Sequence, residues 1–192
     1  YPQYSTTTTA SVADAIAAAA NGLQVEVLHD YHVDAGWAAA VAASIRAHWD
    51  AEGRGERVLL SFHGIPRRLV DGGDPYAAQC EASTRAIAHA LGVPREDLLL
   101  TFQSRFGRER WLEPYTQPTL EALAREGVRR VDVACPGFAV DCLETLEEIA
   151  VENAVAFRGA GGEALRYIPC LNAEPAHADA LAALALQDAG WT

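Results

Sequence analysis

Short apolar runs alternate along the chain with longer, alanine-rich stretches in which apolar residues recur at helical spacing. The runs at residues 58–62 and 98–102 are almost continuously apolar, which is typical of strands buried on both faces of a sheet. The pattern predicts strands at residues 23–28, 57–62, 98–103, 130–135 and 164–168. It predicts helices at residues 11–20, 34–52, 75–91, 117–126, 143–157 and 174–188.

The order of these elements indicates the fold class. Strands and helices alternate at the spacing of a strand–helix repeat, which predicts an α/β fold with a parallel sheet and helices on both faces. No stretch resembles an interdomain linker, so residues 1–192 are expected to form a single unit.

Composition narrows the function classes. The chain has 192 residues, half of them hydrophobic, and a formal net charge of −11, which argues against a nucleic-acid partner. The sequence offers neither an apolar run long enough to span a bilayer nor a signal-peptide pattern. Its four cysteines fit reduced thiols and a cytoplasmic location better than a disulfide framework. The absence of methionine suggests an excerpt of a longer protein.

Ligands of open parallel sheets bind beyond the carboxyl ends of the strands. This rule selects residues 29–32, 63–66, 104–111 and 136–144. His63 follows an apolar strand and precedes a turn containing Gly64 and Pro66, so the strand would aim the imidazole into the crevice. A lone histidine at a strand end is also commonly a hydrogen-bonded structural residue.

The predicted helix at 143–157 carries an acidic row. Glu144, Glu148 and Glu152 follow one another at intervals of four, beside an apolar face that includes Leu143 and Leu146. They could form a solvated face at a helix start, where acids are favoured, or a ladder that guides a cation or takes up protons. Asp141 could cap this helix.

An imidazole and carboxylates at one crevice would suit a borderline divalent metal such as ferrous iron. The sequence offers no closed ligand set, so such a metal would be passed on rather than kept. Trp111 could stack on a flat aromatic ligand or cover the core, and Tyr76 follows an ordinary Asp-Pro helix start.

Several motifs together resemble one family. The runs Ser-Phe-His-Gly-Ile-Pro at 61–66 and Gly-Asp-Pro-Tyr-Ala-Ala-Gln-Cys at 73–80 resemble the signature of ferrochelatases. The run Cys-Pro-Gly-Phe-Ala-Val-Asp-Cys-Leu-Glu-Thr-Leu-Glu-Glu-Ile at 135–149 is similar to the second hallmark of that family, in its Gram-negative bacterial branch. Tyr-Pro-Gln-Tyr-Ser at 1–5 and Gln-Ser-Arg-Phe-Gly at 103–107, followed by Trp111, also fit.

The resemblance implies insertion of Fe²⁺ into protoporphyrin IX to form protohaem, the last step of haem synthesis. It also implies two Rossmann-like lobes around the porphyrin, of which this chain matches the second, chelatase-like lobe. The N-terminal lobe would then be a missing partner, and its lip could provide a peripheral membrane contact.

The resemblance also assigns residues. It implies that His63 and Glu144 are catalytic and meet the metal, and that Glu148 and Glu152 continue an acidic path for protons or metal. The residues implied to line or support the porphyrin pocket are Tyr1, Tyr76, Trp111, Phe138 and Asp141.

The resemblance leaves alternatives open. Some relatives hold a [2Fe–2S] cluster bound by cysteines in a C-terminal extension and by one near the Tyr-Pro-Gln-Tyr-Ser motif. Here that region reads Ser5, Thr6 and Thr7, and the sequence ends at Trp191 and Thr192 without cysteine, which argues against a cluster. A cobalt chelatase of the same fold and a non-catalytic tetrapyrrole-binding lobe remain as competing hypotheses.

Overall fold

A computed structural model describes residues 1–187 of the chain, and its core is a parallel sheet. The strands are β1 (Arg57–His63), β2 (Leu98–Gln103), β3 (Arg130–Ala134) and β4 (Ala164–Ile168), in the spatial order β2-β1-β3-β4. Every pairing among them is parallel. The predicted α/β class and four of the five predicted strands are therefore confirmed.

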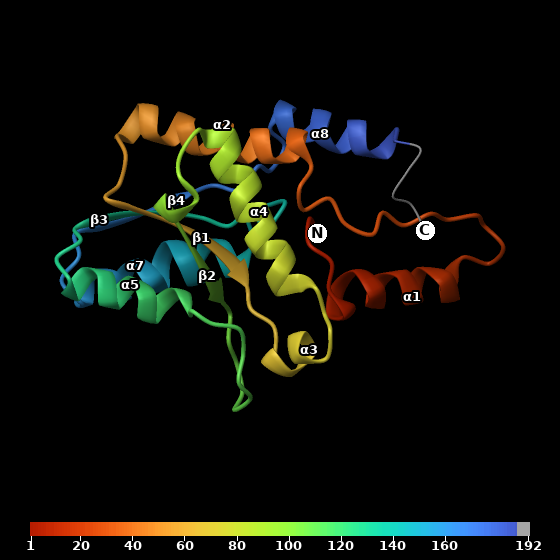
Figure 1. Cartoon of the computed structure of the whole chain (residues 1–192), viewed down its shortest axis with the longest axis horizontal. Coiled ribbons are helices and arrows are strands. Elements are labelled where there is room, and N and C mark those ends of the chain that lie inside the picture. The colour runs from red at the N-terminus through yellow and green to blue at the C-terminus, as the bar shows by residue number, and fades with distance from the viewer. Residues whose placement is uncertain (188–192) are drawn as a thin grey trace.

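Helices cover both faces of this sheet (Figure 1). One face is covered by α2 (Ala35–Glu52) and α4 (Tyr76–Leu91), with α8 (Pro175–Ala185) packed against α2, and the other face by α5 (Thr116–Arg125) and α7 (Ala154–Gly159). Alternate side chains of β1 enter the two cores: Leu60 and Phe62 pack on the first face and Leu59 on the second. This period of two follows from the strand geometry.

The strand order places a topological switch point at β1. The chain leaves β1 to form β2 on one side and returns to form β3 on the other, with His63 in register with Gln103 and Leu60 with Ala134. Connections that diverge from neighbouring strands leave a crevice beyond their carboxyl ends. The segments that follow β1 and β3 therefore meet at this edge of the sheet.

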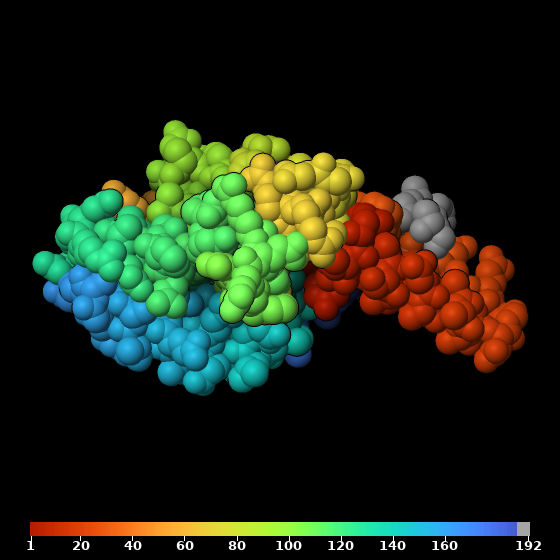
Figure 2. Space-filling model, turned by 90° about the horizontal axis from the view of Figure 1, so that it is seen from below, coloured from red at the N-terminus to blue at the C-terminus, as the bar shows by residue number. Residues whose placement is uncertain are grey.

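The predicted strand at 23–28 is wrong. The N-terminal segment instead forms a π-helical turn, η1 (Thr6–Ala10), that continues into α1 (Ser11–Ala19), and the chain then returns as a loop. Leu23 and Val25 are 74% and 45% exposed. This arm projects from the body of the molecule, away from the sheet (Figures 1 and 2). The alternating pattern finds no neighbouring strand in the described residues, and a strand needs one to satisfy its backbone.

The predicted helix at 143–157 is interrupted. It consists of α6 (Leu143–Leu146), a π-helical segment η3 (Glu148–Asn153) and α7. Leu143 and Leu146 are exposed, whereas Ile149 and Phe157 are buried as expected. The wider π-helical turn changes which side chains share a face, so a uniform period of 3.6 does not hold across it.

The helix termini also differ from some expectations. Cys142, rather than Asp141, is the N-cap of α6. The last helix begins at Pro175 and ends at Ala185, and the predicted end at Asp188 lies outside the described residues. Two short helices, α3 (Arg67–Asp71) and η2 (Arg95–Asp97), were not predicted.

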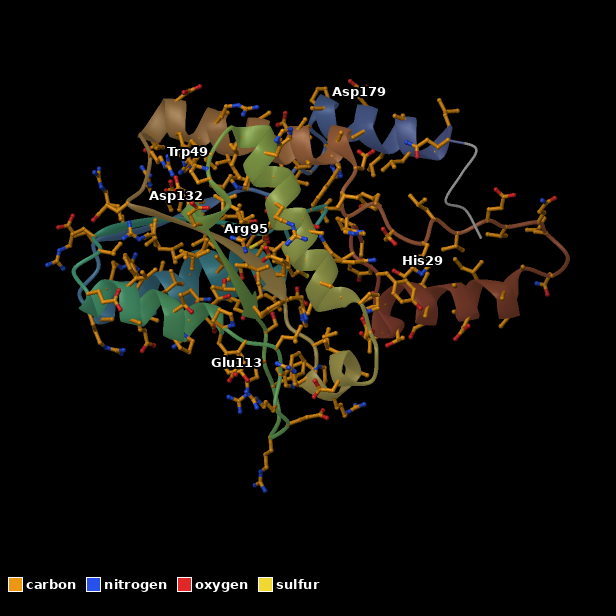
Figure 3. All side chains as sticks on the ribbon, in the orientation of Figure 1. His29, Trp49, Arg95, Glu113, Asp132 and Asp179 are labelled. Atoms are coloured by element: carbon orange, nitrogen blue, oxygen red, sulfur yellow. The ribbon has the colours of Figure 1, made fainter. Side chains whose placement is uncertain are left out.

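A buried carboxylate in the middle of β3, an inner strand, ties the sheet to the C-terminal end of α2 (Figure 3). Asp132 is fully buried in β3 and accepts hydrogen bonds from Trp49 Nε1, Gly55 N and Arg166 Nε at 2.8–2.9 Å. The contacts join α2, β3 and β4 far from the switch point. Across residues 1–187, none of the helices is long and apolar enough to cross a membrane.

Candidate active site

His63 ends β1 at the switch point, and its ring has a defined hydrogen-bonding state. Nδ1 lies 2.7 Å from the carbonyl oxygen of Gly64, which only accepts hydrogen bonds, so Nδ1 carries a proton. In the neutral ring, Nε2 then holds the free lone pair. The backbone at His63 is fixed in turn by Tyr76, whose hydroxyl donates to the His63 carbonyl at 2.8 Å.

Gly64 lets the next segment approach the sheet closely. Its N–H donates to the carbonyl oxygen of Gln103 at 2.8 Å. A Cβ at Gly64 would lie 2.9 Å from that oxygen and 3.1 Å from the Trp111 ring. Trp111 is buried, with its ring centroid 6.2 Å from that of His63. Trp111 therefore supports the imidazole from within the protein and belongs partly to the core.

Glu144 comes from the other side of the switch point, in the first turn of α6. Its pKa lies below the ordinary value, first because its own backbone N–H donates to it, then because the Cys142 thiol hydrogen-bonds to it and protonated His63 attracts it. The imidazole and the carboxylate line the same cavity. Both groups remain accessible, because His63 is half-buried and Glu144 is exposed.

A cavity of about 210 Å³ lies between these two side chains. Its walls come from the N-terminal segment, β1 and the loop after it, α4, and the segment from β3 to α6. The lining residues are Tyr1, Gln3, Thr8, His63, Ile65, Tyr76, Gly137, Phe138 and Glu144. Five of the nine predicted site residues are therefore brought together here, and Trp111 lies directly behind them.

Asp74 attaches the N-terminal segment to this cavity, although the sequence-based site did not include it. One carboxylate oxygen accepts from Ser5 Oγ, Thr6 N and Thr6 Oγ1 at 2.7–2.9 Å, and the other accepts from Tyr76 N at 3.0 Å. Burial raises its pKa, but the hydrogen bonds from Thr6, Tyr76 and Ser5 outweigh this, so the pKa lies below the ordinary value. The available sequence signal was an Asp-Pro pair before a helix.

Asp141 lies outside the cavity lining. Its carboxylate accepts from the Tyr167 hydroxyl, from Cys170 N and from Asn172 Nδ2 at 2.5–3.0 Å. Burial raises the pKa of Asp141, but these donors outweigh it and hold the pKa below the ordinary value. This network joins the end of β4 to the loop before α6, so Asp141 supports the segment that carries Phe138 and Glu144.

The acidic row divides at the π-helical segment. Glu148 is half-buried, and its carboxylate accepts from the backbone N–H and the hydroxyl of Ser104 at 2.6 and 2.5 Å. It lines a second cavity of about 270 Å³, beside Gln103, Ser104 and Arg105. Glu152 is exposed further along η3. Glu144 and Glu148 thus face different cavities, on either side of Gln103.

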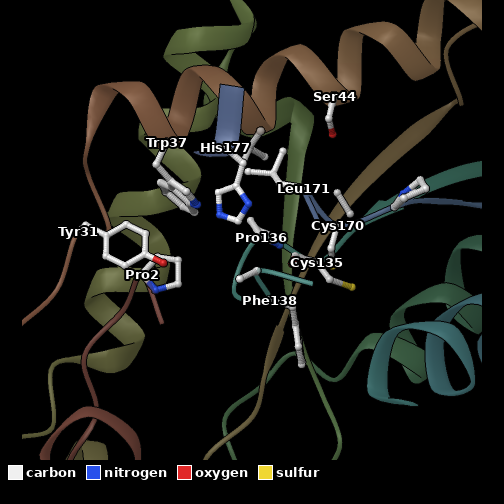
Figure 4. A pocket seen from close by; sticks show the side chains of 14 residues that line it. Pro2, Tyr31, Trp37, Ser44, Cys135, Pro136, Phe138, Cys170, Leu171 and His177 are labelled. Atoms are coloured by element: carbon white, nitrogen blue, oxygen red, sulfur yellow. Dashed lines mark hydrogen bonds between the residues drawn. The ribbon is translucent and has the colours of Figure 1, made fainter. Parts of the chain in front are cut away.

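Other segments selected by the strand-end rule lie apart from the cavity. In residues 29–32, Asp30 accepts from both His29 Nδ1 and His32 Nδ1, at 2.7 and 2.5 Å. A much smaller space of about 20 Å³ lies behind the site, beside Tyr31, Trp37 and His177 (Figure 4). Phe138 lines both this space and the main cavity.

The described part of the chain contains no group of three or more His, Cys, Asp or Glu side chains placed to hold a metal ion. Cys80, Cys135, Cys142 and Cys170 are free thiols. His63 and Glu144 supply an imidazole and a carboxylate to the lining of the main cavity, beside the phenols of Tyr1 and Tyr76.

These features define an α/β protein with a histidine–glutamate cavity at the switch point of its parallel sheet. The family model described as Ferrochelatase matches residues 1–189. The ferrochelatase of Stenotrophomonas maltophilia (strain R551-3) is 60% identical over 191 residues, which cover 97% of this chain. Those of Xanthomonas axonopodis pv. citri (strain 306) and Azoarcus sp. (strain BH72) are 57% and 53% identical over 96% and 99% of it.

The chain belongs to the ferrochelatase family. It spans 59% of the length of the Stenotrophomonas and Xanthomonas relatives and 53% of the Azoarcus relative. The resemblance carried by the motifs at 61–66 and 135–149 is thereby confirmed.

Proposed function

We propose that this chain forms the catalytic wall of a ferrochelatase, which inserts Fe²⁺ into protoporphyrin IX to give protohaem. The observation that carries the proposal is the pairing of His63 and Glu144 across one cavity at the switch point. Membership of a family whose curated relatives are named ferrochelatase supports the same reaction.

Insertion requires removal of two pyrrole protons and of the water around the metal. His63 Nε2 is the proposed base, because Nδ1 is already committed to the Gly64 carbonyl and Nε2 keeps its lone pair. Glu144, an exposed carboxylate of lowered pKa, stays anionic and draws the proton or the metal to the opposite side. A wall that fits a bent macrocycle better than a flat one favours the geometry in which nitrogen lone pairs leave the ring plane.

The porphyrin requires more surface than this chain provides. The cavity of about 210 Å³ is smaller than the roughly 300–1,000 Å³ typical of small-molecule sites. Tyr1, Tyr76 and Phe138 supply the apolar side of the wall, with Trp111 behind it. An N-terminal lobe, in the part of the relatives that this chain does not cover, is proposed to supply the opposite wall and any contact with a membrane.

The remaining acids have supporting roles in this proposal. Asp141 holds the loop that carries Phe138. Glu148 and Glu152 in η3 are the proposed route for protons or metal, which leaves the main cavity at Glu144 and passes Gln103 to reach the second cavity at Glu148. Four free thiols fit a cytoplasmic protein. Ser5, whose hydroxyl donates to Asp74, ends the Tyr-Pro-Gln-Tyr-Ser motif in the region where cluster-holding relatives have a cysteine, so we propose no resident [2Fe–2S] cluster.

The test compares two proteins. One is this chain alone. The other, the fusion enzyme, joins this chain to the part of the Stenotrophomonas maltophilia ferrochelatase that it does not cover. Protoporphyrin IX is titrated into each while the Soret band is recorded, and metallation is then followed with Fe²⁺ and, separately, with Co²⁺.

We expect the fusion enzyme to bind protoporphyrin IX and to metallate it with Fe²⁺, with loss of turnover in the His63→Ala variant. Binding without metallation would replace the proposal with a tetrapyrrole-binding lobe. A strong preference for Co²⁺ would replace it with a cobalt chelatase. If the fusion enzyme does not bind protoporphyrin IX, the ferrochelatase, the tetrapyrrole-binding lobe and the cobalt chelatase are all contradicted.

A further inference from the structure

Gln103 connects the two halves of the proposed active site. It is the last residue of β2 and lies in register with His63 on the neighbouring strand. Its side chain crosses to the opposite element, where Nε2 donates to the backbone carbonyl of Glu144 at 2.6 Å. One buried amide thus joins the strand pair that carries the imidazole to the helix that carries the carboxylate.

The amide of Gln103 is nearly saturated with hydrogen bonds. Nε2 also lies 3.4 Å from Glu148 Oε2, while Oε1 accepts from Ser61 Oγ at 2.8 Å and from Cys135 Sγ at 3.5 Å. The side chain is 3% exposed, so water does not replace these partners. Because the Glu144 carbonyl only accepts, the nitrogen must face α6 and the oxygen must face Ser61.

Gln103 contacts the helical segment at the junction between α6 and the π-helical segment η3. Glu144 belongs to α6, Glu148 starts the π-helical segment, and Gln103 Nε2 contacts both. The contact holds Glu144 at one cavity and Glu148 at the other. A side chain of equal size without an amide would fill the space but would leave the Glu144 carbonyl and the Glu148 carboxylate without this donor.

We propose that Gln103 is a positioning residue, which sets the location of the Glu144 carboxylate relative to His63 Nε2. This inference rests on the proposed function. Gln103 acts through the backbone of Glu144, so it affects the chemical step and leaves the apolar wall that binds the porphyrin unchanged.

The test uses the fusion enzyme with three variants. Gln103→Met removes the amide at nearly constant volume. Gln103→Glu keeps the shape but places an acceptor where the donor was. Thr84→Val is the matched control, because it removes a buried hydroxyl of α4 that donates only to the Cys80 carbonyl and lies outside the hydrogen-bond network of Gln103. The measurements are Tm, kcat, porphyrin KM and the pH profile of kcat.

We expect Gln103→Met to lower kcat by roughly tenfold while porphyrin KM stays within about twofold. Thr84→Val, at a similar loss of Tm, should keep kcat. Gln103→Glu should lose more turnover at neutral pH and recover part of it as the pH is lowered, because the protonated carboxyl regains one donor. Such a recovery is specific to hydrogen bonding and does not follow from a loss of packing.

The inference is overturned if Gln103→Met retains wild-type kcat, or if KM alone changes. If Gln103→Met does not fold, Ser61→Ala tests the same amide by removing the donor to Oε1, and unchanged kcat in that variant also overturns the inference. The two proposals fail separately: an inactive wild-type fusion enzyme contradicts the proposed function, whereas an active one that is insensitive at Gln103 contradicts only the positioning role.

Discussion

His63 donates a hydrogen bond from Nδ1 to the carbonyl oxygen of Gly64, its neighbour in the chain, at 2.7 Å. The tautomer of the neutral ring follows from this contact, because a carbonyl offers no proton in return. The lone pair therefore belongs to Nε2. The predictions below begin with this group.

Replacing His63 with alanine should lower turnover of the fusion enzyme by roughly 10²–10⁴-fold, the usual contribution of a general base. His89→Ala, at an exposed position near the end of α4, is the control and should retain activity. The ¹⁵N spectrum of the wild-type ring should show Nδ1 protonated and Nε2 bare at alkaline pH. The opposite tautomer would refute the assignment of Nε2 as the base.

The Glu144 carboxyl should titrate below its ordinary pKa, and His63→Ala should raise this pKa. The rise should be partial, because the largest cause, the backbone N–H of Glu144 itself, remains in the variant. Carboxyl ¹³C NMR over a pH series measures both values. An identical Glu144 pKa in the two proteins would show that the imidazole and the carboxylate do not share the cavity.

Asp74→Ala should lower the free energy of unfolding by roughly 1.5–3 kcal/mol, the range for a hydrogen bond to a charged group. The reason is that Ser5, Thr6 and Tyr76 all lose their acceptor. Urea unfolding at pH 7 provides the measurement. Glu109→Ala, at an exposed ion pair with Arg68, provides the control with little expected change.

The contribution of Asp74 should also depend on pH. Its folded-state pKa is lowered, so the contribution is present above the pKa of the unfolded chain and is lost as the pH falls through the lower, folded-state value. The stability difference between wild type and Asp74→Asn should therefore shrink in acid. A difference that stays constant down to pH 2 would contradict the charged network.

Asp132→Ala should destabilise the chain by about 3–5 kcal/mol, because it leaves Arg166 without its buried partner. Arg125→Ala, which breaks the more exposed pair with Glu121, should cost less than about 1 kcal/mol. Thermal and urea unfolding measure both. Porphyrin binding by the folded Asp132→Ala fusion enzyme should remain unchanged, since Asp132 is buried within β3 and does not line the main cavity.

The local sequence was sufficient to predict most of the sheet and most of the helices that cover it. The runs 57–62 and 98–103 are apolar almost throughout, and such segments are stable only when covered on both faces, which predicts a parallel sheet between helices. The strand-end rule then selected His63 and the segment around Glu144. The same reasoning failed at 23–28, where Leu28 forms only an isolated β-bridge and Leu23 and Val25 are exposed, because none of the strands among residues 1–187 lies beside this segment.

The site itself depended on contacts between distant residues. Asp74 was missed because nothing near it in the chain signals that Ser5 and Thr6 donate to its carboxylate across 69 and 68 positions, respectively. Glu144 and Glu148 were expected on one face of a regular helix, but the π-helical winding and the bonds to Gln103 and Ser104 turn them toward different cavities.

The amino-acid sequence by itself determined the α/β class, the parallel strands and the residue types available at the switch point, since these follow from hydrophobic periodicity and from the chemistry of individual side chains. Only the tertiary structure decided which of those side chains meet. The winding of residues 143–159, the tautomer of His63 and the attachment of the N-terminal segment to Asp74 are set by hydrogen bonds, several of them between residues 40 or more positions apart. Local propensity contains no information about such partners.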